Sequence, residues 1–113
     1  MKHVTFGDKA LLMGDDAGDA LLEYARLIAD NGRADTVTLR AISSDGNTVE
    51  ASFLLDASSS LMIESTNSEV EPPDNSEAVA DLRERIDAVT RPVSAFADGE
   101  WTGPDYDVPD VTS

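Results

Sequence analysis

The chain has no cysteine, a single histidine and no long hydrophobic run. Without cysteine there are no disulfides, thiolate ligands or thiol nucleophiles, so ordinary packing must hold the fold together. His3 is expected to be a solvated strand residue, and neither a Ser-His-Asp triad nor a histidine metal site can be assembled around it. The longest aliphatic runs, such as Ala10–Met13, are much shorter than a signal-peptide core or a membrane span. We therefore expect a soluble, cytoplasmic protein that makes no membrane contact.

Basic residues are scarce. The chain has 8 lysines and arginines against 23 aspartates and glutamates, a formal net charge of −15. Such a charge repels nucleic acid and anionic membranes, so neither is expected as a partner. The acidity has two explanations: a coding bias typical of a high-GC bacterium or phage, or a surface that meets a basic protein partner. Glycine-rich phosphate loops are also missing, so no nucleotide or other cofactor is predicted.

The stretch GDDAGDALLEYARLIADNG, residues 14–32, places three aspartates just ahead of a leucine-rich run. A calcium loop of the EF-hand kind needs glycine at its sixth position and a bidentate glutamate at its twelfth. Counted from Asp15, these positions hold Ala20 and Arg26, so the EF-hand pattern fails at both. Only a loose carboxylate site is left as a metal hypothesis, and its weak candidate ligands are Asp15, Asp16 and Asp19.

A helix explains the same stretch better. Asp16 is predicted to be the N-cap with Asp19 at the third helical position, where acidic side chains face the positive end of the helix dipole. Apolar residues then recur at helical spacing, and Asn31-Gly32 predicts a left-handed end. Gly18 is a poor helix former but costs least in a first turn. The expected apolar stripe consists of Leu21, Tyr24, Ala25 and Ile28. The expected ion pairs are Glu23–Arg26 and Arg26–Asp30.

Residues 36–42 and 48–55 alternate in hydrophobicity and predict a β-hairpin. A three-residue loop, Ser44-Asp45-Gly46, with Gly46 left-handed, keeps the apolar side chains on one face. This register pairs Val37 with Phe53, Leu39 with Ala51, and Ala41 with Val49.

Three further strands are predicted around this hairpin. Residues 61–66, after the turn sequence ASSS, are expected to continue the sheet as a meander, with Leu61 and Ile63 on the apolar side. At the start of the chain, KHVTF and ALLM flank Gly7-Asp8 and are expected to form a short hairpin.

Residues 77–91 predict a second helix, capped by Ser76 or Asp74 and ended by Arg91-Pro92. Asp81–Arg85 and Arg83–Asp87 are expected as ion pairs one turn apart. Its apolar stripe is narrow, which is typical of a helix docked on its own sheet but also of a seam between two subunits. The stripe consists of Val79, Leu82, Ile86 and Val89.

The end of the chain combines acidic residues with the only tryptophan. Glycine, proline and aspartate are dense there, which is typical of a flexible, solubilising tail. Aromatic residues spaced among acids can also form a docking peptide, and Trp101 could instead fold back over the sheet. The candidate partner-binding residues are Phe96, Trp101, Tyr106, Asp105 and Asp107.

Together these patterns predict an α+β domain: an antiparallel sheet of about five strands in ββαβββα order, with two helices packed on it and an acidic tail. Residues 1–66 form the core, 67–76 a Pro-containing linker, 77–91 the docked helix and 92–113 the tail. The predicted function is a non-enzymatic protein-binding module of the adaptor, chaperone, immunity or inhibitor type, with a basic partner. The alternatives are a carboxylate-based divalent-metal-binding or catalytic domain, and a homodimer formed through helix 77–90.

Overall fold

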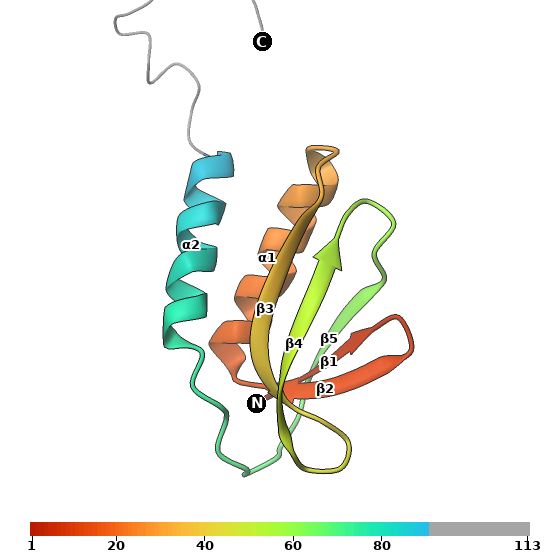
Figure 1. The fold of residues 1–113 in the computed structure, drawn as a ribbon, viewed down its shortest axis with the longest axis vertical. Coiled ribbons are helices and arrows are strands. Elements are labelled where there is room, and N and C mark those ends of the chain that lie inside the picture. Colours follow the sequence, from red (N-terminus) through yellow and green to blue (C-terminus); the bar gives the residue numbers. More distant parts are fainter. Residues whose placement is uncertain (91–113) are drawn as a thin grey trace, which may run out of the picture.

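A computed structural model describes residues 1–90 and confirms the α+β fold with its ββαβββα order (Figure 1). The predicted tail, with Phe96, Trp101, Tyr106, Asp105 and Asp107, lies outside the described residues. The elements are β1 (Lys2–Phe6), β2 (Lys9–Met13), α1 (Asp15–Asp30), β3 (Asp35–Ile42), β4 (Thr48–Leu55), β5 (Leu61–Ser65) and α2 (Ser76–Thr90). The five strands form one antiparallel sheet in the order β4-β3-β2-β1-β5. No helix among residues 1–90 is long and apolar enough to span a membrane.

Both predicted hairpins are present. In the β3–β4 hairpin Val37 lies opposite Phe53, Leu39 opposite Ala51 and Ala41 opposite Val49, which confirms the predicted register. Its loop places Gly46 at φ 88°, a conformation that other residues rarely adopt. The β1–β2 hairpin turns at Gly7, where φ is 64°.

The predicted meander was wrong in its last step. β5 does not pair with β4 but crosses to the other side of the sheet and pairs with β1. There Leu61 lies opposite Phe6 and Ile63 opposite Val4, so these two side chains of β5 join the helix-covered face. The pairing leaves β4 and β5 as the two edge strands of the sheet.

α1 begins two residues earlier than predicted, at Asp15 instead of Ala17. Gly14, not Asp16, is the N-cap, and no side chain caps this end of the helix. Gly18 has a packing role that helix propensity does not reveal, because a Cβ at this position would lie 3.1 Å from Cβ of Lys2 in β1. The predicted left-handed end is confirmed: Gly32 has φ 63°, and the Arg33 N–H donates to the Ile28 carbonyl.

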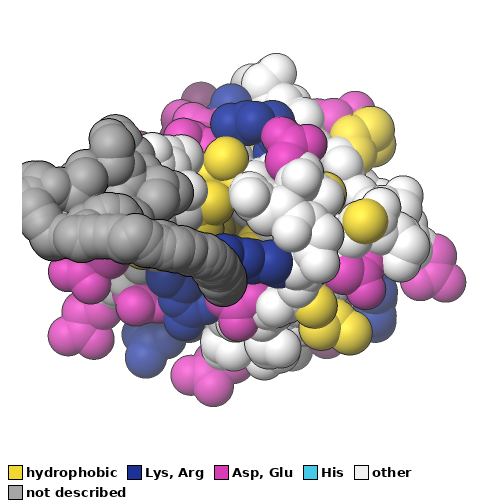
Figure 2. Space-filling model, turned by 90° about the horizontal axis from the view of Figure 1, so that it is seen from above, with side chains coloured by type: hydrophobic (Ala, Val, Ile, Leu, Met, Phe, Trp, Pro, Cys, Tyr) yellow, Lys and Arg dark blue, Asp and Glu magenta, His cyan; other side chains and the backbone are white. Residues whose placement is uncertain are grey.

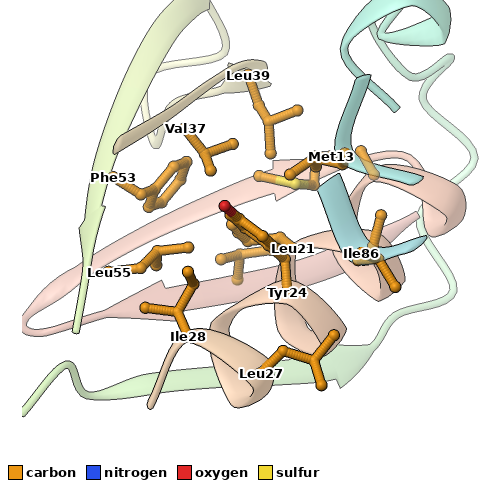
Figure 3. Close-up of a cluster of buried hydrophobic side chains, with 14 of the residues drawn as sticks. Met13, Leu21, Tyr24, Leu27, Ile28, Val37, Leu39, Phe53, Leu55 and Ile86 are labelled. Carbon is orange, nitrogen blue, oxygen red and sulfur yellow. The ribbon is translucent and has the colours of Figure 1, made fainter. Parts of the chain in front are cut away.

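The core lies between α1 and the sheet, and α2 closes it on one side (Figures 1 and 3). Strand side chains that point toward α1 meet its apolar stripe, while the opposite face of β3 and β4 stays exposed. No charged side chain is buried among residues 1–90, and Tyr24 is the buried side chain that carries a hydroxyl. Its largest fully buried side chains are Met13, Leu21, Leu39, Leu55, Leu82 and Val4.

The apolar stripe of α2 packs against its own domain. Leu82 and Ile86 are buried in the core, and Val79 and Val89 pack against it partly exposed. The stripe lies inside the domain, as expected of a docked helix, but α2 packs mainly against α1 and not directly on the sheet. A dimer through the same stripe would require α2 to leave the domain.

Two predicted helical ion pairs are replaced by one between the helices. Glu23 does not pair with Arg26, nor Arg83 with Asp87; instead Arg83 Nη1 lies 2.8 Å from Glu23 Oε1. The predicted pairs Arg26–Asp30 and Asp81–Arg85 are present at 3.1 and 2.7 Å. Sequence spacing within one helix cannot show that a neighbouring helix offers a closer partner.

Candidate interaction surface

The three aspartates that were weak metal candidates lie at the start of α1, and two of them have cationic neighbours. Asp15 Oδ1 lies 2.8 Å from the Met1 amino group, which lowers the pKa of the Asp15 carboxyl. Asp19 lies 3.6 Å from the Lys2 ammonium, and Asp16 is exposed in the first turn of the helix. Among residues 1–90 no three carboxylate or histidine side chains gather into a group that could hold a metal ion.

Side chains from α2 and from the residue just ahead of it reach one edge of β3. β3 pairs with β2 only at Ile42, opposite Leu12, so most of this edge has no neighbouring strand. Asn75, just ahead of α2, accepts a hydrogen bond from the Arg40 N–H and donates one to the Arg40 carbonyl, both at 2.8 Å. Arg85 donates to the Thr36 carbonyl at 3.2 Å. Side chains from the α2 region thus occupy backbone groups that a further strand would otherwise use.

Tyr24, Asp35 and Arg85 join α1, β3 and α2 in one polar network. The Tyr24 hydroxyl donates to Asp35 Oδ2 at 2.5 Å, and Arg85 Nη1 donates to the same oxygen at 2.9 Å. The Tyr24 hydrogen bond, supported by the Thr36 N–H and Arg85, holds the pKa of the Asp35 carboxyl below its usual value. Burial and the neighbouring Asp35 raise the pKa of the Tyr24 hydroxyl. The network is a structural link between elements, because Tyr24 is buried within the core.

Two hollows lie at the start of α2. One, of about 410 Å³, lies between β3 and α2, and Glu50, Asp74, Glu77 and Arg40 contribute its charges. The other, of about 740 Å³, lies between the starts of the two helices and is partly lined by Pro72, Pro73, Val79 and Met1. Both are open depressions, and acidic side chains line each of them.

The outer edge of β4, defined here as the side of Thr48–Leu55 that faces away from β3, has backbone groups without a neighbouring strand. Opposed residues in an antiparallel ladder alternate between exchanging two hydrogen bonds and exchanging none. The N–H and C=O groups of Arg40 bond to Asn75, and the Leu54 carbonyl accepts from Ser59 Oγ, so these groups point away from the partner strand. Since both residues have even numbers, the even-numbered residues are those that do not exchange hydrogen bonds between β3 and β4. The N–H and C=O groups of Glu50 and Ser52 therefore point outward, and within residues 1–90 nothing hydrogen-bonds to them.

The sheet face opposite the helices is polar with a few apolar exceptions. Thr38 and Ser52 join their hydroxyls across β3 and β4 at 2.8 Å, and His3 Nδ1 lies 3.1 Å from Glu64 on β1 and β5. Leu54 and Met62, exposed by 59% and 50%, are the most exposed large apolar side chains on this face. The prediction that His3 is a solvated strand residue is confirmed, since it lies in β1 and is exposed by 40%.

The acidic side chains that outnumber the basic ones lie on the surface of the domain. Several of the basic side chains in residues 1–90 are already paired with carboxylates: Lys2, Arg26, Arg83 and Arg85. Acidic and basic side chains are spread over the face seen in Figure 2, with hydrophobic ones in small separate patches. Because no charged side chain is buried in the described part of the chain, the excess carboxylates face solvent.

The described residues thus define a small α+β domain with an apolar core, an acidic surface and one long uncovered strand edge. Comparison of the chain with protein families, curated proteins and solved structures finds no match. Sequence reasoning missed the outer edge of β4, because the expected meander placed residues 61–66 beside it.

Proposed function

We propose that the protein is a small, acidic, non-enzymatic binding module, of the adaptor, chaperone, immunity or inhibitor type, whose partner is a basic protein. The observation that carries the proposal is the solvent-facing excess of carboxylates over a core without buried charge. Opposite charges on two proteins raise the rate of encounter and suppress wrong partners. A cysteine-free chain suits a reducing cytoplasm, where we expect the protein to act.

The partner-binding residues of the tail, Phe96, Trp101 and Tyr106 with Asp105 and Asp107, remain a prediction for residues outside the described range. Binding by the folded domain is the second route. It would use acids that have no ion-pair partner among residues 1–90, such as Glu50 and Glu77, which line the hollow between β3 and α2.

The proposal is tested by capturing partners from source cells on the full chain at low and high salt, and identifying them by mass spectrometry. A basic protein that is retained at low salt and released at high salt is expected, because screening weakens contacts between exposed charges. If the proteins retained at low salt are not basic, or salt does not release them, the proposal fails.

Two variants with equal charge change locate the site on the domain. Glu50→Gln with Glu77→Gln should reduce retention of the partner, whereas Glu84→Gln with Asp87→Asn, on the exposed face of α2, should not. A third variant replaces Phe96, Trp101 and Tyr106 with alanine. If only the third variant loses the partner, the tail is the binding site and the domain is its carrier.

A further inference from the structure

We propose that the outer edge of β4 accepts an extended segment of a basic protein as an additional antiparallel strand. The backbone of that segment would exchange hydrogen bonds with Glu50 and Ser52. The inference rests on the proposed function, since it takes the partner to be basic, and it adds where and how the partner binds. Strand addition of this kind obtains affinity from backbone hydrogen bonds and specificity from alternate side chains.

The two outer edges of the β3–β4 pair differ in how many of their backbone groups already have hydrogen-bond partners. On the β3 side, Asn75 and Arg85 occupy the backbone groups of Arg40 and Thr36. On the β4 side, within residues 1–90, only the Leu54 carbonyl is occupied, by Ser59. Proteins usually protect an exposed edge with charged side chains, above all lysine, or with proline, a bulge or a very short strand. β4 is eight residues long, has no lysine, proline or bulge, and carries one charged side chain, Glu50.

The charges around β4 favour a cationic strand. Asp45 precedes the strand, Glu50 lies in its middle and Asp56 follows it. Hydrogen bonds from the Ser43 hydroxyl and the Asn47 N–H lower the pKa of the Asp45 carboxyl.

Hydrogen bonds from Ser58 likewise lower the pKa of the Asp56 carboxyl. Both carboxyls are therefore ionised at neutral pH. A lysine or arginine opposite Glu50 would lie on the exposed sheet face, where its charge meets that carboxylate.

The same charges disfavour a second copy of this chain as the occupant. If Glu50 of one copy lay opposite Ser52 of the other, Asp45 of each copy would come close to Asp56 of the other. If Glu50 lay opposite Glu50 of the second copy, two carboxylates would face each other directly. Pairing Ser52 with itself would need the Leu54 carbonyl, which already accepts from Ser59. Two copies of net charge −15 also repel each other over longer distances.

The test uses the full chain and three blocked peptides of alternating lysine and valine. The first is unmodified, the second is N-methylated on its lysine amides and the third on its valine amides. With the lysines on the exposed face, the lysine amides are those that face β4, so only the second peptide loses these hydrogen bonds. All three have the same charge, so binding through the acidic surface alone would treat them alike.

We expect calorimetry to show the lysine-methylated peptide binding about tenfold or more weakly than the other two. In NMR spectra, amide exchange at Glu50 and Ser52 should slow on binding of the unmodified peptide, while Ala51, already paired with β3, should change little. Ser52→Pro should weaken binding, because it removes an outward N–H that β3 does not use, whereas Ser52→Ala should not.

Equal affinities for the two methylated peptides, or unchanged exchange at Glu50 and Ser52, would overturn strand addition at β4. If binding stayed salt-sensitive in that case, the proposed basic partner would stand with a different site. If the peptides did not bind and cell extracts yielded no salt-sensitive basic partner, both proposals would fail.

Discussion

Replacing Leu82 with alanine tests whether α2 is part of the domain's own core. Leu82 is 1% exposed and lies on the face of α2 that packs against the core. Truncating a fully buried leucine costs about 2–5 kcal/mol, from lost burial and from the cavity left behind. A domain of this size has a total unfolding free energy of about 5–15 kcal/mol, so the variant should remain folded but be clearly weakened.

The assay is urea unfolding of the full chain, followed by far-UV circular dichroism at two protein concentrations. With a denaturant slope of about 1–2 kcal/mol per molar urea, the loss lowers the midpoint by about 1 M or more. Glu84→Ala, an exposed change on the same helix, should alter stability by less than about 0.5 kcal/mol. A Leu82→Ala midpoint equal to that of the parent, or a parent midpoint that rises with protein concentration, would refute an intramolecular role.

Four more outcomes follow from the polar contacts and the hairpin turn. Asn75→Ala should lower the unfolding free energy by about 1–3 kcal/mol, measured by urea unfolding, because the Arg40 backbone loses two hydrogen bonds; a change within error would contradict that role. Asp35 has a lowered pKa in the folded state, so its contribution to stability is present above its unfolded pKa and is lost as pH falls through the folded value. The unfolding free energy of Asp35→Asn should therefore fall less steeply at acid pH than that of the parent. Tyr24 has a raised pKa, so its contribution is present below its unfolded pKa and is lost as pH rises through the folded value, and Tyr24→Phe should flatten the alkaline limb. Gly46→Ala should cost about 1 kcal/mol in thermal unfolding, because alanine is strained at φ 88°; an unchanged melting temperature would contradict the turn assignment.

Features that depend on neighbouring residues were predictable from the sequence. The alternation of TVTLRAI and TVEASFLL determined both the β3–β4 pairing and its register, because a shift by one residue would turn every apolar side chain outward. The Asn31-Gly32 end of α1 was predictable for a similar reason, since it needs only a residue that tolerates positive φ.

Features that depend on distant residues were not predictable. β5 follows β4 in the chain, yet it pairs with β1, and either pairing would place Leu61 and Ile63 on the apolar face. The Arg83–Glu23 pair and the Asn75–Arg40 hydrogen bonds each join elements whose relative position the local pattern does not contain. The outer edge of β4 became a candidate site only once β5 was seen to lie elsewhere.

Amide hydrogen exchange on the full chain, alone and with the basic partner released by salt from source cells, is the most direct test of the central claim. A partner that adds a strand to β4 should slow exchange at Glu50 and Ser52, because their outward N–H and C=O groups gain hydrogen-bond partners. Protection confined to residues 92–113, with Glu50 and Ser52 unchanged, would contradict the claim and place the binding site in the tail.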